Sequence, residues 1–119
     1  MAIDNSKTID FISLDGKPNT ALLVISDHLD WSNSLEHQYV LQEKLNAYLA
    51  FVESGEIFER FPKALGKGIE MQIVFLHEPD APGFRFLTKA QAIIETAGFS
   101  FSYKVGIEGP GPLPALSRI

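Results

Sequence analysis

The chain has no cysteine among its 119 residues, which excludes disulfide bonds, thiol nucleophiles and thiolate metal sites together. This composition fits a reducing compartment. The longest apolar run, at residues 21–25, is far shorter than the roughly 20 residues that a membrane-spanning helix needs. The first ten residues, MAIDNSKTID, contain neither a basic nor an apolar segment, so we expect no signal peptide. These absences predict a cytoplasmic protein with no membrane partner.

Positive charge is also scarce. Ten Lys and Arg residues stand against fifteen Asp and Glu residues, which gives a formal net charge of −5. The field of such a molecule repels phosphate backbones, and no run of basic residues reverses it locally. We therefore expect no nucleic-acid partner.

Motifs that hold cofactors or activate nucleophiles are missing as well. His77 and Glu78 do not begin an HExxH zinc motif, because Pro79, Asp80 and Ala81 follow them. The GFSFS segment at residues 98–102 ends in serine where a nucleophile elbow needs glycine. We therefore expect no cofactor, and we consider a non-enzymatic binding or interaction module a better prediction than an enzyme.

The residues that are present indicate one folded domain. Hydrophobic residues make up 45% of the chain, and nine Phe, three Tyr and one Trp supply bulky side chains for a core. We predict a single domain over residues 1–108, followed by a Pro- and Gly-rich tail over residues 109–119. Phe58, Phe61, Phe84 and Phe86 could line a ligand pocket, but core packing is the commoner role of such residues.

Hydrophobic periodicity predicts the order β-β-α-β-α-β, with the helices on one face of a four-stranded sheet in a two-layer α/β sandwich. The opposite face would be partly polar or covered by a second copy of the chain. The Ala21–Ile25 segment has no polar side, so we expect its strand to be buried on both faces. A short helical turn or an added helix is expected at residues 56–61. The predicted strands span 8–14, 19–26, 69–77 and 99–107, and the predicted helices span 32–54 and 86–97.

Two carboxylates, an imidazole and the only tryptophan lie within the ISDHLDW segment at residues 25–31. Because α/β folds place many sites at the carboxyl ends of strands, the segment is a candidate for acid–base or metal chemistry. That hypothesis gives a metal-dependent or acid–base enzyme. Its catalytic candidates are Asp27, His28, Asp30, Glu36 and His37, and its candidate metal ligands are His28, His37 and His77.

A structural interpretation of the same segment is the favoured one. Asp30 or Ser32 would cap the long helix by accepting a hydrogen bond from an unpaired backbone N–H. Asp27 would hold the turn through an Asx-type hydrogen bond, and Trp31 would pack over the start of the helix.

Several of these segments together resemble a known family. The ISDHLDW segment, the LQEKLNAYLAFVESGEIFERFP segment that follows and the later FLTKAQAIIETAGFSFSYKV are similar to a small bacterial family known only as a domain of unknown function. The resemblance covers about residues 8–105 and leaves the tail outside. It implies no activity, cofactor or catalytic residue.

We expect the protein to form a homodimer. The last strand is predicted to lie at a sheet edge, where unpaired N–H and C=O groups can recruit another chain. Its outward residues Ser100, Ser102 and Gly106 are small and uncharged, and only Lys104 carries a charge. The tail residues Leu113, Leu116 and Ile119 could also find a place to be buried on a neighbouring subunit. A monomer with a frayed tail is the alternative.

Overall fold

The computed structural model of the chain describes residues 11–14 and 16–106. Within these residues, four strands and three α-helices follow one another in the order ββααβαβ, with a single 3₁₀ turn at Pro62–Ala64. The predicted tail, and the ends of the predicted strands at residues 8–10 and 107, lie outside the described residues. The elements are β1 (Phe11–Ser13), β2 (Thr20–Asp27), α1 (Ser34–Glu53), α2 (Glu56–Arg60), β3 (Gly68–Phe75), α3 (Ala81–Thr96) and β4 (Ser100–Val105).

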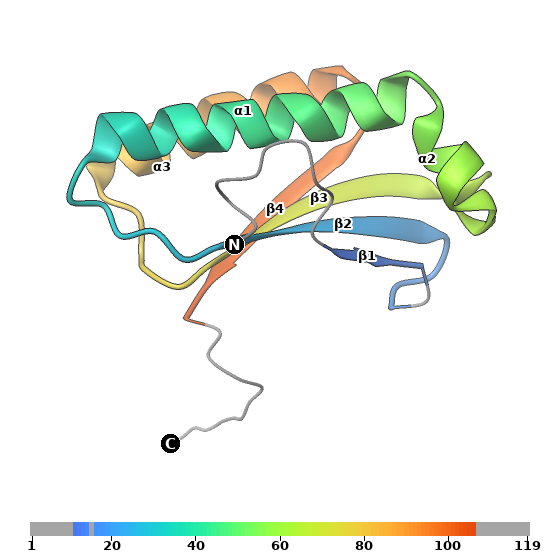
Figure 1. Ribbon diagram of the computed structural model, residues 1–119, viewed down its shortest axis with the longest axis horizontal. Helices are drawn as coiled ribbons and strands as arrows, with labels where there is room; N and C mark the ends of the chain where they lie inside the picture. The colour runs from blue at the N-terminus through green and yellow to red at the C-terminus, as the bar shows by residue number, and fades with distance from the viewer. Residues whose placement is uncertain (1–10, 15, 107–119) are drawn as a thin grey trace.

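The strands form one mixed sheet in the order β1-β2-β3-β4. The predicted hairpin is present, since β1 pairs antiparallel with β2, whereas β2, β3 and β4 run parallel. Two crossover connections, from β2 to β3 and from β3 to β4, each lead to the next strand in the same direction across the sheet. Because crossovers of this kind are right-handed, their helices must lie on the same face. Figure 1 shows α1 and α3 side by side over one face, which confirms the predicted two-layer arrangement.

The added helix α2 makes the observed order differ from the predicted β-β-α-β-α-β. The long helix ends at Glu53, and Gly55 follows with a φ of +84°, a backbone conformation that favours glycine. The chain then turns into α2, whose Ile57 is fully buried. Burial of this one apolar side chain gives the short helix a place in the core.

The second long helix begins at Ala81, five residues before the predicted start. The predicted start of this helix at residue 86 was therefore wrong. Asp80 is the N-cap, and its side chain accepts a hydrogen bond of 2.9 Å from the backbone N–H of Gly83. Pro82 lies in the first turn, where a missing N–H costs nothing.

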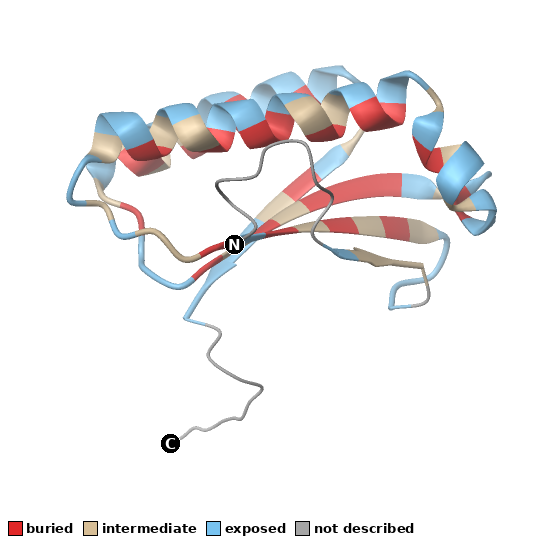
Figure 2. Ribbon diagram, viewed as in Figure 1, coloured by how far each residue is buried: buried red, intermediate tan, exposed pale blue. Residues whose placement is uncertain are grey.

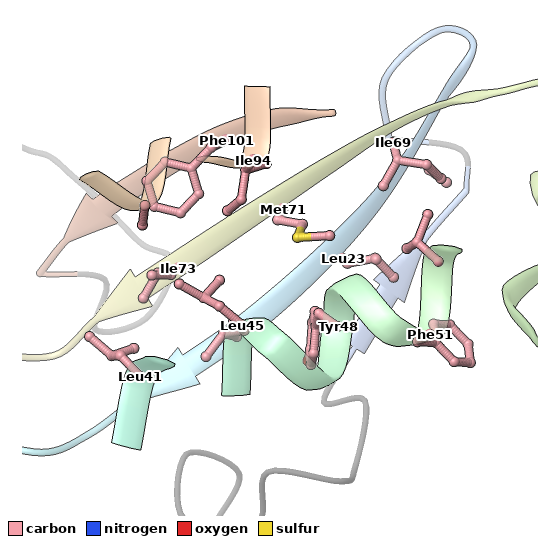
Figure 3. Packing of buried hydrophobic residues seen from close by; sticks show 14 of the residues in the cluster. Leu23, Leu41, Leu45, Tyr48, Phe51, Ile69, Met71, Ile73, Ile94 and Phe101 are labelled. Carbon is pink, nitrogen blue, oxygen red and sulfur yellow. The ribbon is translucent and has the colours of Figure 1, made fainter. Parts of the chain in front are cut away.

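The core lies between the sheet and the two long helices (Figure 2). In β2, Ala21, Leu23 and Ile25 are fully buried toward the helices, whereas Leu22 and Val24 are only partly buried on the opposite face. The expectation that this segment is buried on both sides was therefore only half correct. Figure 3 shows Leu41, Leu45, Tyr48 and Phe51 projecting from one side of α1 toward side chains of the sheet.

The alternation predicted for the last strand holds only in its first half. Phe101 is buried against the core, but Tyr103 and Val105, which share its face, are 41% and 38% exposed. Sheets twist, and Figure 1 shows the C-terminal half of β4 running away from the helix layer. This divergence of the strand from the helix layer explains why Tyr103 and Val105 are exposed.

Opposite the helices, a polar network crosses the uncovered face of the sheet. Glu70 on β3 accepts hydrogen bonds from Lys17 Nζ at 2.5 Å and from Ser102 Oγ at 2.6 Å, and Gln72 donates to Ser102. Glu70 is only 8% exposed. The network ties the β1–β2 loop to β3 and to the edge strand β4.

Candidate functional site

The loops that follow β2 and β3 lie side by side at one end of the sheet, beyond the carboxyl ends of the parallel strands (Figure 1). Two hydrogen bonds join them. Trp31 Nε1 donates to the backbone carbonyl of His77 at 3.2 Å, and Ser34 Oγ donates to Asp80 Oδ1 at 2.9 Å. This is where open α/β sheets commonly bind ligands, and it is where the ISDHLDW segment lies.

Within this junction, His37 from the first turns of α1 reaches back to the last residue of β2. Its Nε2 lies 2.5 Å from Asp27 Oδ2, and its Nδ1 lies 2.9 Å from the backbone oxygen of Asp30. The second oxygen of Asp27 accepts the backbone N–H of Leu29 at 3.0 Å. Asp27 and His37 are 1% and 2% exposed. The pair therefore forms a buried contact between a strand end and a helix start.

The hydrogen bonds leave neither nitrogen of His37 available to a ligand. A carbonyl oxygen can only accept, so Nδ1 must carry the hydrogen in its contact with Asp30. The Nε2–Oδ2 contact then holds one further proton between imidazole and carboxylate. A general base needs a nitrogen that can reach the substrate, and here both are occupied.

Trp31 closes the remaining access to the imidazole. Its ring stacks on His37 with centroids 3.7 Å apart and an interplanar angle of 23°, and it also contacts Phe75. A Cβ on Gly83 would come within 2.8 Å of the indole, so only glycine lets the first turn of α3 approach this closely. The predicted Asx turn at Asp27 and the packing of Trp31 over the helix start are both confirmed.

The helix cap differs from the prediction. Asn33, rather than Asp30 or Ser32, is the N-cap of α1, and its Oδ1 accepts the backbone N–H of Glu36 at 3.2 Å. Asp30 instead closes the preceding turn, where its Oδ1 accepts both the backbone N–H and the hydroxyl of Ser32. These two hydrogen bonds hold the pKa of Asp30 below its ordinary value. The Asp30 carboxylate therefore stabilises the turn that precedes α1 and does not cap the helix itself.

The remaining predicted residues are spread around the junction. Asp30, Glu36 and His37 border a shallow hollow of about 230 Å³, whereas Asp27 is buried and is not part of its lining. The Nδ1 atom of His28 is buried and has no hydrogen-bond partner within the described part of the chain. Over residues 11–14 and 16–106, no group of three or more His, Asp or Glu side chains is placed to hold a metal ion, so the structure does not gather His28, His37 and His77 into a ligand set.

A larger groove, which the sequence reasoning did not find, lies between α1 and α3. It encloses about 480 Å³, a size typical of ligand pockets. Two rows of mixed apolar and polar residues line it: residues 38, 42, 45, 46 and 49 of α1 and residues 82, 85, 86, 89, 90, 93 and 94 of α3. Their spacing of three and four residues is that of one helix face.

The groove continues toward the start of α1. A second hollow shares Gln38, Gln42 and Phe86 with it and is bordered by Leu35 and Tyr39. Leu35 is 77% exposed, Tyr39 61% and Ile93 62%. Large apolar side chains that are exposed singly are ordinary, but a group of them around one concave surface marks an interaction site. We call the two hollows together the helical groove.

Charge in the main hollow of the helical groove is of one sign. Among the residues that the structure describes, Arg85 and Lys89 are its only charged lining residues, and they lie four residues apart on α3. The amides of Gln38, Gln42 and Asn46 face them from α1. In a chain with a net charge of −5, this is a local positive edge beside an apolar floor.

Comparisons with known proteins give a family and nothing more specific. No curated protein and no solved structure matches the chain. No helix of the described residues is long and apolar enough to cross a membrane. A family model described as a family of unknown function matches residues 1–106, which include the strand, helix and junction segments described above. The chain therefore belongs to this family, DUF6572.

Proposed function

We propose that this protein is a non-enzymatic binding module whose partner is an amphipathic helix with an acidic flank, held in the helical groove. The observation that carries the proposal is the exposure of Leu35, Tyr39 and Ile93 around a concave, apolar surface between two helices. Polar residues at these exposed positions would not destabilise the isolated domain, so the exposed apolar side chains favour a binding partner.

The shape of the groove favours a helix as the occupant. α1 and α3 present their lining residues at helical spacing, and a third helix packs into such a groove by inserting residues at positions i, i+3, i+4 and i+7. Arg85 and Lys89 then face one edge of the incoming helix. Carboxylates on that edge would pair with them, and the rest of the negatively charged surface would repel other approaches.

The buried Asp27–His37 contact does not favour a catalytic function. Both ring nitrogens of His37 are hydrogen-bonded and its ring is stacked under Trp31, so a substrate has no nitrogen to exchange a proton with. The contact instead fixes where α1 begins, and thereby the position of one wall of the groove.

Two designed helical peptides test the proposal. Both carry the same leucine stripe, one flanked by glutamate and the other by lysine, and each is titrated with the full chain while fluorescence anisotropy is recorded. We expect the acidic peptide to bind and the basic peptide to bind at least about tenfold more weakly. Binding of both peptides alike, or of neither, would contradict the proposal.

Substitutions in the chain locate the binding surface. The double variant R85E/K89E should reverse the preference between the two peptides, and Ile93→Gln should weaken the acidic one. The control variants are Lys63→Glu and Leu65→Gln, which alter an exposed cation and an exposed leucine outside the groove. They should leave both affinities unchanged.

A further inference from the structure

The outer edge of β4 is left unpaired by the described part of the chain. β4 is the last strand of the sheet, and β3 is its only neighbour there. It contains no proline, and its one charged residue is Lys104. Natural sheets usually protect such an edge with several charges, a bulge or a proline.

The main-chain groups that point outward at this edge can be identified. The backbone N–H of Gly106 donates to the carbonyl of Phe75 on β3, so Gly106 faces inward. Successive residues of a strand direct their N–H and C=O to alternate sides. Phe101, Tyr103 and Val105 therefore direct both groups away from the sheet. These are also the residues whose side chains lie on the helix-covered face.

We propose that two copies of this chain pair antiparallel through β4, with Tyr103 opposite its own counterpart across a two-fold axis. In this register Phe101 faces Val105 of the other copy, and Ser102 faces Lys104. All three outward-facing residues then exchange their N–H···O=C hydrogen bonds with the second strand. The result is a continuous eight-stranded sheet whose helices all lie on the same face.

Neighbouring registers are less favourable for physical reasons. Placing Ser102 opposite itself leaves Val105 outside the ladder, so fewer outward groups are paired. Placing Lys104 opposite itself brings two ammonium groups together, which destabilises a cross-strand pair. The Tyr103 register instead joins aromatic and β-branched residues directly across the strands, and such pairs stabilise a sheet.

The exposure of the side chains also favours a second copy as the occupant. Tyr103 and Val105 are 41% and 38% exposed where β4 leaves the helix layer, and Tyr103 already contacts Phe75 and Phe84. A second β4 strand would cover Tyr103 and Val105 with the aromatic side chains of the other copy. The edge is thus complementary to itself in backbone polarity, side-chain type and charge.

The molecular mass of the full chain, measured by light scattering over a range of concentrations, gives the first test. We expect two chains per particle at micromolar concentration. Tyr103→Lys, which sets two ammonium groups against each other across the axis, should reduce the mass to one chain while the circular dichroism spectrum stays folded. Tyr39→Lys, which changes an exposed aromatic residue in the helical groove, should leave the dimer intact.

Single cysteines then determine the register, because the chain has no cysteine of its own. Directly opposite residues of a hydrogen-bonded pair have Cα atoms about 5.5 Å apart, within the range of a disulfide. Tyr103→Cys should therefore form a covalent dimer on mild oxidation. Ser102→Cys and Lys104→Cys should cross-link much less, since each lies diagonally from its own counterpart, beyond about 7 Å.

Three outcomes would overturn the proposal. A monomeric mass at every concentration excludes the dimer. A dimer that Tyr39→Lys breaks and Tyr103→Lys does not would place the interface on the helical groove. A dimer whose fastest cross-link forms at residue 102 or 104 would exclude the Tyr103 register. The first and third outcomes do not bear on the peptide titrations, whereas the second would place another copy of the chain in the groove that is proposed to bind the peptide.

Discussion

At position 27, aspartate and asparagine have the same shape but offer His37 different partners. With asparagine, a neutral imidazole can donate from Nδ1 to Asp30 and accept at Nε2 from the new amide, so every polar atom remains satisfied. With alanine, Nε2 is left buried without a partner. The buried pair thus distinguishes loss of charge from loss of hydrogen bonding.

We therefore expect Asp27→Ala to lower the free energy of unfolding by about 3–5 kcal/mol, because it removes one partner of a buried pair. Asp27→Asn should cost only about 0.5–1.5 kcal/mol. Urea denaturation followed by circular dichroism measures both. Equal losses for the two variants would mean that the charge itself, rather than hydrogen-bond satisfaction, stabilises the junction.

Glu70 gives a residue-scale prediction about pH. Burial raises the pKa of its carboxyl, but hydrogen bonds from Lys17 and Ser102 and the charge of Lys17 outweigh burial and hold the pKa below its ordinary value of 4.5. Since the folded-state pKa is the lower one, the unfolded chain binds the proton more tightly. The stability that Glu70 contributes is therefore complete above its ordinary pKa and is lost as the pH falls through the lowered value.

The test compares the urea midpoints of the wild-type chain and Glu70→Gln at pH 6 and at pH values below 4. We expect the wild-type chain to be the more stable at pH 6, and the difference to shrink as the pH falls. Glu59→Gln, at an exposed position on α2, serves as the control. A difference that stays constant with pH would show that Glu70 acts through packing alone.

At the scale of elements, the N-cap of α1 allows a prediction that distinguishes Asn33 from Ser32 as the capping residue. Asn33→Ala removes the hydrogen bond to Glu36 N and should cost about 0.5–2 kcal/mol, while Asn33→Ser should restore most of that loss. Ser32→Ala removes no bond to the helix and should cost less. Thermal melting of the three variants measures these losses in stability. A larger loss for Ser32→Ala than for Asn33→Ala would identify Ser32 as the N-cap, as the sequence predicted.

Two leucines on α1 test its two faces. Leu45 is 4% exposed and points toward the sheet in Figure 3, so Leu45→Ala should cost about 2–5 kcal/mol through the cavity it leaves. Leu35 is 77% exposed at the helical groove, so Leu35→Ala should change the free energy of unfolding by less than about 0.5 kcal/mol. Similar losses at both positions would mean that the helix face is misassigned.

The elements show what could be predicted from the sequence and what could not. Periodicity predicted the sheet, the hairpin and both long helices, because each depends on which residues are apolar. The early start of α3 was readable in principle, since Asp80 followed by Pro82 is a helix-start signature. Pro and Gly more often interrupt a helix than begin one, so the sequence of residues 82–83 favoured the later predicted start at residue 86.

The misassigned cap has a different cause. Asp30, Ser32 and Asn33 all favour a cap chemically, so only the path of the backbone decides among them. The Asp27–His37 contact joins residues on different elements, and it appears only when the strand and helix are placed together. The groove was missed for the same reason, because its walls come from two helices separated by β3.

At the scale of the molecule, the buried hydrophobic residues of the described ranges form one continuous cluster. It extends from Ile57 of α2, through Leu45 and Met71, to Phe75 at the carboxyl end of β3. Trp31 packs against this last part and contacts Phe75. The junction and the far end of the sheet are therefore expected to unfold together rather than as separate units.

The single tryptophan makes this cooperativity measurable. Trp31 reports the junction through its fluorescence, whereas far-ultraviolet circular dichroism reports mainly α1 and α3. Because one core supports both, the two signals should give the same midpoint in urea, as a two-state transition requires. Because Trp31 stacks on His37, its fluorescence reports directly on the Asp27–His37 contact. A fluorescence transition at lower urea than the loss of helix would show that the Asp27–His37 junction opens while the sheet and helices remain folded.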